Sequence, residues 1–232
     1  MRLALIGDIH GNHLALQAVL NAAIAQSVDL LLVTGDLVGY YFAPLKVLEQ
    51  LAAWEKFVVR GNHEDMLAAS RVDTKFSHEV EKRYGCGVRL AIEQLSDKQL
   101  DDLCSLPHPL ELSLGGLRIL LCHGSPWDVD QYIYPDAGSD LMIRFDSYDF
   151  DVVVMGHTHY PMIREMGKTL LVNPGSVGQP RNRQPGASWA LLDTESRSVT
   201  LHCENYDCSA LVNECQRRHP AIPYLSEVLQ RT

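Results

Sequence analysis

The sequence predicts an α/β fold that begins with alternating strands and helices. Short apolar runs at residues 2–6, 29–34 and 57–59 each lead into a glycine, as buried strands often do. Between them, segment 12–26 carries apolar residues at helical spacing, and segment 44–54 begins with a proline that suits a first helical turn. Strands and helices in this order imply parallel pairing through right-handed crossovers.

The central part of the chain, from residue 64 to residue 105, is predicted to be helical. A break is expected at residues 85–87, which read Gly-Cys-Gly. The helix restarts at Ser96, which forms the pattern of a capping box with Gln99 three residues later. We expect residues 1–232 to form a single domain that carries segment 64–105 as a helical insert.

The remaining elements are predicted from alternation and turn signals. Segments 110–114 and 117–122 flank a Gly-Gly pair, which is typical of a β-hairpin. A helix at residues 139–145 and a buried strand at 152–155 follow. Short strands are then expected at 162–166, 169–172, 188–192 and 198–203, before a helical segment at 209–230 that is interrupted at Pro220 and Pro223.

The composition is that of an ordinary globular protein, with 46% hydrophobic and 21% charged residues in a chain of 232. This length suffices for one large domain with a sizeable core. No apolar run approaches the roughly 18 residues that a membrane helix needs, and residues 1–6 are too few for a signal peptide. We therefore expect no membrane partner, a cytoplasmic location and reduced thiols at the six cysteines.

The formal charge of −9 bears on the class of partner. An acidic protein without a run of Lys or Arg repels a nucleic-acid duplex at long range, so a duplex is not the expected partner. An anionic substrate would need a local source of positive charge. Bound metal ions can supply it, because they are often the largest charges in their site.

Metal-binding side chains follow five of the predicted buried strands. In chain order they are Asp8 and His10, Asp36, Asn62 with His63, His123, and His157 with His159. Ligands of α/β sheets bind beyond the carboxyl ends of the strands, so these residues are expected to converge. Carboxylate, imidazole and amide ligands suit manganese, iron or zinc better than a metal that prefers thiolates.

Two local arguments support this placement. Residues two apart on an extended chain point the same way, so Asp8 with His10, and His157 with His159, should each offer two ligands to one side. The glycines that precede the ligands are expected to let the backbone turn sharply or adopt dihedral angles that other residues avoid.

Five short motifs, in this order, resemble those of the calcineurin-like metallophosphoesterases, especially the small bacterial and archaeal phosphodiesterase-like members. They are Asp-x-His at 8–10, Gly-Asp at 35–36, Gly-Asn-His-Glu at 61–64, His123 and Gly-His-x-His at 156–159. The resemblance extends from residue 3 to about residue 192. It implies the metallo-dependent phosphatase fold, a four-layer α/β/β/α sandwich with two mixed β-sheets.

The resemblance also implies two metal ions and the role of each ligand. One ion would be bound by Asp8, His10, Asp36 and His159, and the other by Asp36, Asn62, His123 and His157. Asn62 and His63 would be the catalytic residues, with His63 stabilising charge or protonating the leaving oxygen. The reaction would be in-line attack on phosphorus by a water that bridges the metals. Manganese is the first candidate, with iron, zinc or nickel as alternatives.

Substrate contacts are expected from Asn62, His63 and Arg181. Guanidinium groups suit phosphate, although solvated surface side chains would explain Arg181 and its neighbour Arg183 equally well. Residues 173–178 resemble a loop that frames the metals in the family, and an ordinary turn explains them as well.

Three further features have two explanations each. Tyr40, Tyr41 and Phe42 could stack on a nucleobase or aryl group, or pack against the helical insert, and we favour packing. Glu64 could orient His63 or start a helix, and we favour the helix start. A zinc site at Cys203, Cys208, Cys215 and His219 is disfavoured by its spacing relative to ordinary buried thiols.

The expected function is hydrolysis of a small phosphate monoester or diester by a dinuclear centre. A nucleotide or dinucleoside polyphosphate hydrolase is the alternative enzyme, and a non-catalytic scaffold on the same fold is the alternative from another class. The helical insert is expected to overhang the site and influence substrate choice. The sequence leaves open a homo-oligomer, the native metal and the physiological substrate.

Overall fold

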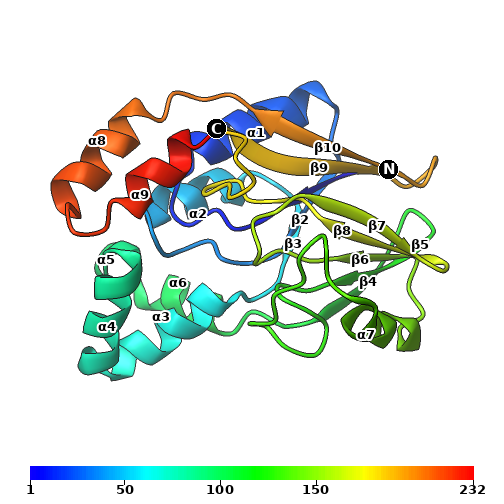
Figure 1. The fold of residues 1–232 in the computed structure, drawn as a ribbon, viewed down its shortest axis with the longest axis horizontal. Helices are drawn as coiled ribbons and strands as arrows, with labels where there is room; N and C mark the ends of the chain where they lie inside the picture. The colour runs from blue at the N-terminus through cyan, green and yellow to red at the C-terminus, as the bar shows by residue number, and fades with distance from the viewer.

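The computed structural model describes residues Met1–Thr232 and contains ten strands in two mixed sheets (Figure 1). The strands are β1 (Arg2–Ile6), β2 (Leu30–Val33), β3 (Lys56–Val58), β4 (Leu110–Leu114), β5 (Leu117–Leu121), β6 (Val152–Val154), β7 (Met162–Met166), β8 (Thr169–Asn173), β9 (Ala187–Asp193) and β10 (Ser198–Glu204). The first sheet has the order β10-β9-β1-β2-β3, and the second has the order β4-β5-β6-β8-β7. Strands β1, β2 and β3 are parallel to one another, as are β5, β6 and β8.

The helices confirm the predicted helical segments. Segment 64–105 divides into four helices, the first of which starts at Asn62. The helices are α1 (His13–Ala25), α2 (Pro44–Ala52), α3 (Asn62–Val72), α4 (Thr74–Tyr84), α5 (Gly87–Gln94), α6 (Asp97–Cys104), α7 (Ser139–Met142), α8 (Ser209–Arg218) and α9 (Tyr224–Glu227), with 3-10 turns η1 (Ile143–Ser147) and η2 (Val228–Gln230). The predicted capping box is present, because Ser96 accepts from the Gln99 N–H and Gln99 from the Ser96 N–H. None of the helices combines the length and the apolar character of a membrane span.

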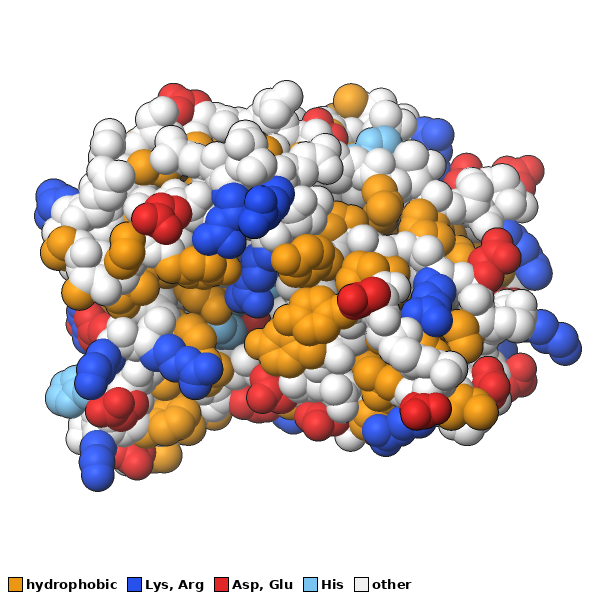
Figure 2. Space-filling model, in the orientation of Figure 1, with side chains coloured by type: hydrophobic (Ala, Val, Ile, Leu, Met, Phe, Trp, Pro, Cys, Tyr) orange, Lys and Arg blue, Asp and Glu red, His pale blue; other side chains and the backbone are white.

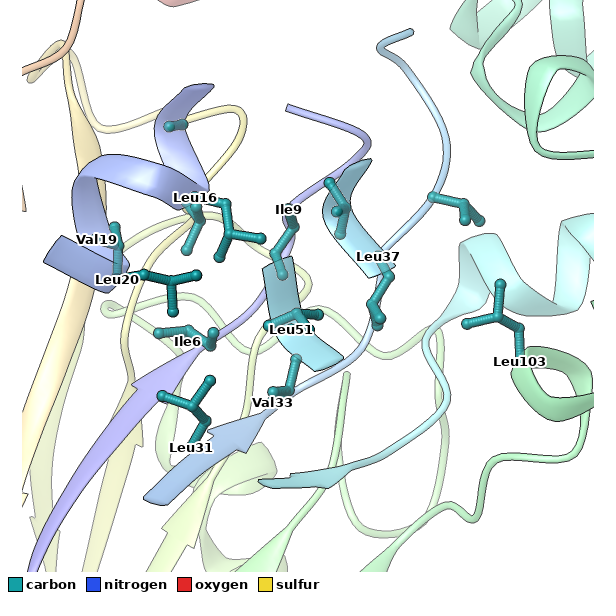
Figure 3. Close-up of a cluster of buried hydrophobic side chains, with 14 of the residues drawn as sticks. Ile6, Ile9, Leu16, Val19, Leu20, Leu31, Val33, Leu37, Leu51 and Leu103 are labelled. Carbon is teal, nitrogen blue, oxygen red and sulfur yellow. The ribbon is translucent and has the colours of Figure 1, made fainter. Parts of the chain in front are cut away.

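The two sheets pack face to face and make a four-layer sandwich, which confirms the predicted fold class. Strand β1 alternates, so that Leu3 and Leu5 join the core between the sheets, while Ala4 and Ile6 face the first helical layer. Figure 3 shows Ile6 together with Leu16 of α1 in that outer cluster. The opposite layer, made by α7, η1 and the loop before them, covers the outer face of the second sheet.

The aromatic trio after Gly39 is buried in a cluster with the carboxy-terminal helices. Tyr41 is fully buried and Phe42 is 8% exposed, and both belong to a cluster that contains Leu90 of the predicted helical insert as well as Leu211 of α8 and Leu225 of α9. Packing is therefore the role of Tyr41 and Phe42, whereas Tyr40 also borders the cavity described below. All six cysteines are free thiols, and none belongs to a group of side chains able to hold a metal.

Glu64 fastens the loop after β2 to the start of α3. Its buried carboxylate accepts hydrogen bonds from the backbone N–H groups of Asp36 (2.9 Å), Leu37 (2.8 Å) and Gly61 (2.8 Å). The Gly61 contact is the cap of α3, so the expected helix-start role is present. The other two contacts tie the Asp36 loop to that helix, and Glu64 makes no hydrogen bond to the His63 ring.

We predict that Glu64→Ala destabilises the protein by about 3 kcal/mol, because three buried N–H donors lose their acceptor. Glu64→Gln keeps one oxygen and should lose less. Urea unfolding measures both, with Glu79→Ala on the exposed face of α4 as a matched control that should change stability by less than about 0.5 kcal/mol. An unfolding midpoint for Glu64→Ala equal to that of the control would contradict the anchoring role.

Candidate metal centre

The predicted ligands lie where the carboxyl ends of parallel strands from both sheets meet. The first sheet supplies residues after β1, β2 and β3, and the second supplies residues after β5 and β6. The structure thereby brings together all seven residues that the sequence singled out for metal binding: Asp8, His10, Asp36, Asn62, His123, His157 and His159. All of them are buried except Asn62, which is partly exposed.

One group of ligand atoms contains Asp8, His10 and His159. The Nε2 atom of His159 lies 3.2 Å from Oδ1 of Asp8 and 3.1 Å from Nε2 of His10. The Nε2 atom of His10 lies 4.0 Å from the same carboxylate oxygen. Three donor atoms from two sheets therefore converge within one small volume.

A second group contains Asp36, His123 and His157. The Nε2 atom of His123 lies 3.4 Å from Oδ2 of Asp36, and 3.1 Å from both Nδ1 of His157 and Oδ1 of Asn62. The same Asp36 oxygen lies 3.6 Å from Nε2 of His10. The Asp36 carboxylate thus lies between the two groups and contacts both.

Backbone carbonyl groups orient three of the imidazole rings. The Nδ1 atoms of His10, His123 and His159 lie 3.1, 2.7 and 2.6 Å from the carbonyl oxygens of Val38, Thr34 and Gln179 respectively. Because a carbonyl oxygen only accepts, each Nδ1 carries the proton and donates it. In a neutral ring the Nε2 lone pair is then free to point into the cluster, as metal-binding histidines require.

This geometry fits a bound cation. The Nε2 atoms of His10 and His159 face each other at 3.1 Å, and two neutral rings held in this way would present one acceptor to another. The burial of His10 holds its pKa well below the usual range, so this ring is neutral. A metal ion between such nitrogens would satisfy both lone pairs.

The carboxylates of Asp8 and Asp36 also stabilise positive charge within the cluster. Burial alone would lower the pKa of His123, yet the Asp36 and Asp8 carboxylates raise it to about 10. Burial would raise the pKa of Asp36, but the imidazoles of His123 and His63 hold it well below its ordinary value. The pKa of His157 falls to about 3, chiefly because the ring is buried and close to His123.

The backbone is left-handed at five of the seven predicted ligands, which corrects the expectation of extended geometry. Asp8, His10, Asp36, His157 and His159 have φ angles of 50°, 51°, 54°, 68° and 62°, and they make up five of the nine non-glycine residues with positive φ. Asp8 and His10 do share one group, but His157 and His159 fall in different groups. Such strained conformations cluster at functional sites, where the surrounding structure holds them in place.

The preceding glycines allow close approach at Gly61 and Gly156, and the expected unusual dihedral angle is found at Gly35. Only Gly35 has a positive φ, of 95°. A Cβ atom on Gly61 would lie 2.2 Å from Oδ1 of Asp36, and one on Gly156 would lie 2.7 Å from Oδ2 of Asp8. Any larger residue at Gly61 or Gly156 would therefore displace a carboxylate of the cluster.

His63 and Asn62 begin helix α3 beside Asp36. The His63 N–H donates to Oδ1 of Asp36 at 2.9 Å, while the ring packs edge-on against His10 and Tyr84. Its Nδ1 atom is buried without a hydrogen-bond partner, and burial lowers the pKa of the ring to about 4. His63 also forms a third candidate metal group with His10 and Asp36.

Arg181 lies at the cluster, whereas Arg183 is exposed away from it. Arg181 donates from Nη2 to Oη of Tyr40 (3.1 Å) and to Oε1 of Gln179 (3.2 Å), and its buried Nε has no partner. A cavity of about 20 Å³ adjoins it, lined by Asp36, Tyr40, Asn62, His63, Tyr84, Tyr132, His157, His159 and Arg181. Figure 2 shows histidine atoms in a hollow of this face, with basic and apolar side chains around its rim.

Residues 173–178, which resemble a loop that frames the metals in the family, contact the ligand loops, whereas Tyr132 was missed in the sequence. Ser176 donates from Oγ to the Asp8 carbonyl oxygen at 2.7 Å, and Asn173 donates from Nδ2 to the Gly156 carbonyl oxygen at 2.7 Å. The loop at residues 173–178 therefore holds the ligand loops in place. Tyr132 lines the cavity from a long loop, and its only signal in the sequence is its place in a Tyr-Ile-Tyr run after His123.

Comparisons with known proteins agree with this arrangement. Phosphodiesterase YfcE of Escherichia coli is 28% identical over 210 residues, which cover 86% of this chain and 91% of YfcE. The crystal structure of a metallophosphoesterase from Sphaerobacter thermophilus gives a TM-score of 0.80 at 26% identity, covering 97% of this chain and 98% of the other. A hypothetical protein from Pyrococcus horikoshii shares the fold with a TM-score of 0.84 at 22% identity, over 99% and 98% of the two chains.

The family model described as the calcineurin-like phosphoesterase superfamily domain matches residues 1–197, which include every side chain of the cluster. The same residues carry the Asp and His ligand atoms that converge from the two sheets, and the Asn62 amide oxygen that contacts His123. The chain therefore belongs to the calcineurin-like phosphoesterase superfamily and is a metal-dependent hydrolase of phosphoric ester bonds.

Proposed function

We propose that the chain hydrolyses a small phosphate ester with two metal ions, both of which Asp36 would help to hold. The observation that carries this proposal is the pair of ligand groups that meet at this carboxylate, each with its donor atoms within 4.8 Å of one another. Asp8, His10, Asp36 and His159 would hold one ion. Asp36, Asn62, His123 and His157 would hold the other.

The donor set indicates which metal is expected. Carboxylate oxygens, imidazole nitrogens and the Asn62 amide oxygen suit manganese, with iron, zinc and nickel as alternatives, and neither ligand group contains a cysteine that would favour a softer ion. When bound, the two ions would supply an activated water nucleophile and stabilise negative charge on the phosphoryl oxygens.

His63 and Arg181 are the proposed contacts to the phosphate. Both line the same small cavity beside Asp36, and each has a buried nitrogen without a hydrogen-bond partner. A bound anion would accept hydrogen bonds from such nitrogens, which is favourable because a buried polar group without a partner is costly. His63 would hydrogen-bond an oxygen that gains charge as the ester bond breaks, and Arg181 would orient the phosphate.

We further propose that residues 1–232 act as one domain and that α3 to α6, the helical insert, influence substrate choice. Helix α3 carries Asn62 and His63, and Tyr84 at the end of α4 lines the cavity. A phosphodiester is the substrate class favoured by the relationship to YfcE, whose name describes it as a phosphodiesterase.

We predict that Asp36→Asn lowers metal affinity by at least about 100-fold and abolishes most turnover, because both ligand groups lose their shared charge. Metal analysis after dialysis, together with hydrolysis of bis(p-nitrophenyl) phosphate, measures the two effects. Asp140→Asn on the exposed surface of α7 is the matched control and should behave as wild type. Unchanged metal content and turnover in Asp36→Asn would refute the dinuclear proposal.

His63→Ala should lower kcat by about 100-fold or more while the metal content stays unchanged, because His63 is proposed to act on the phosphate and not on the metal. Steady-state kinetics and elemental analysis of the same sample separate the two roles. Loss of one metal equivalent would instead assign His63 as a ligand, in keeping with its position beside His10 and Asp36.

A further inference from the structure

Two tyrosines of the loop after β5 stand exposed beside the cluster. Tyr132 and Tyr134, here called the tyrosine platform, are 40% and 41% exposed, whereas Ile133 between them is 1% exposed. This alternation is that of an extended segment with one face in the core and the other in solvent. Both rings are thus held outward by a buried neighbour.

The platform is continuous with the candidate metal centre. The ring centroid of Tyr132 lies 4.0 Å from that of His157, and the Tyr134 ring stacks on Tyr132 at 5.7 Å with an angle of 17° between the planes. The Tyr160 ring follows at 5.8 Å, edge-on to Tyr134. A row of aromatic rings therefore leads from a ligand of the proposed metal site to the surface.

The loop that carries the platform is fixed in place. Ile133 packs in the cluster that contains Met142 and Phe145, and Trp127 of the same loop lies 5.0 Å from the Phe145 ring. A rigid platform loses little conformational entropy when a ligand binds, which favours stacking. The platform therefore has the properties of a preformed binding surface.

The charge around the hollow beyond the platform favours a neutral group there. A shallow hollow of about 430 Å³ beyond it is lined by Tyr134, Pro135, Asp136 and Tyr160, without any basic side chain. On the side of the metal centre, the Asp130 carboxylate lies 3.3 Å from Nε2 of His157. Arg181 lines the small cavity together with Tyr132 and is the proposed contact to the reacting phosphate. In the hollow, a second phosphate would meet the Asp136 carboxylate and no basic side chain, whereas an uncharged aromatic ring would not be repelled.

We infer that the tyrosine platform binds the nucleobase of a nucleotide-type phosphate ester while its phosphate lies at the metal centre. This inference rests on the proposed function for the position of the phosphate. Bases stack on aromatic side chains with little dependence on sequence, since every base presents a π-face. The platform, and not the buried Tyr41 and Phe42, would then give the enzyme its preference for nucleotides.

The test compares binding of two ligands that differ only in the base. Calorimetry on the manganese-loaded protein should show AMP binding about tenfold or more tightly than ribose-5-phosphate. Tyr134→Ala should remove most of this difference, and Tyr134→Phe should retain it because the ring is kept. Tyr134→Leu, which keeps an apolar side chain without a ring, should resemble Tyr134→Ala. Thermal melting of each variant checks that the fold is intact.

Equal affinity of the wild type for AMP and ribose-5-phosphate would overturn the inference. A preference for phenyl phosphate over methyl phosphate, without one for AMP, would also overturn it and assign the platform to an aryl alcohol. The proposed function has a separate readout. If AMP binds through the platform but neither bis(p-nitrophenyl) phosphate nor a nucleotide ester is hydrolysed, the inferred base binding is supported and the proposed reaction is refuted.

Discussion

The structure depends on how the charges of a buried cluster of carboxylates and imidazoles are stabilised where the two sheets meet. Asp8 and Asp36 are almost completely buried, and burying unpaired carboxylates is strongly unfavourable. Backbone N–H groups stabilise part of this negative charge, because the His157 N–H donates to Asp8 and the His63 N–H donates to Asp36. A bound cation would neutralise the remaining negative charge, so metal binding and the stability of these loops are expected to be coupled.

The loops around the cluster are over-determined by contacts from distant segments. Glu64 holds the Asp36 loop, Ser176 holds the Asp8 loop, and carbonyl groups of Val38 and Gln179 fix the rings of His10 and His159. These contacts keep left-handed backbone at residues that would otherwise avoid it. Ligand geometry is therefore a property of both sheets together, and not of any single motif.

Much of the fold follows from local patterns in the sequence. The apolar runs, the Gly115-Gly116 hairpin and the Ser96 capping box each depend on near neighbours, and all are found in the structure. The division of ten strands into two sheets depends on long-range pairing, such as that of β1 with β9, which no local pattern reveals. The family resemblance supplied that layering.

The residues of the candidate site were predicted by type and position, and the structure brings them together, while their roles remain proposals. The local geometry could not be predicted, because the left-handed φ at His157 and the close contact at Gly156 arise from segments far away in the chain. Tyr132 was missed since nothing near it in sequence shows that its ring lies against His157. Contacts of this kind become visible only in three dimensions.

Anomalous diffraction from crystals of the manganese-loaded protein would test the central claim most directly. The account predicts two separate manganese peaks, one between Asp8, His10 and His159 and the other between His123, His157 and Asn62, with the Asp36 carboxylate in contact with both. A single peak, or two peaks of which only one touches Asp36, would contradict it.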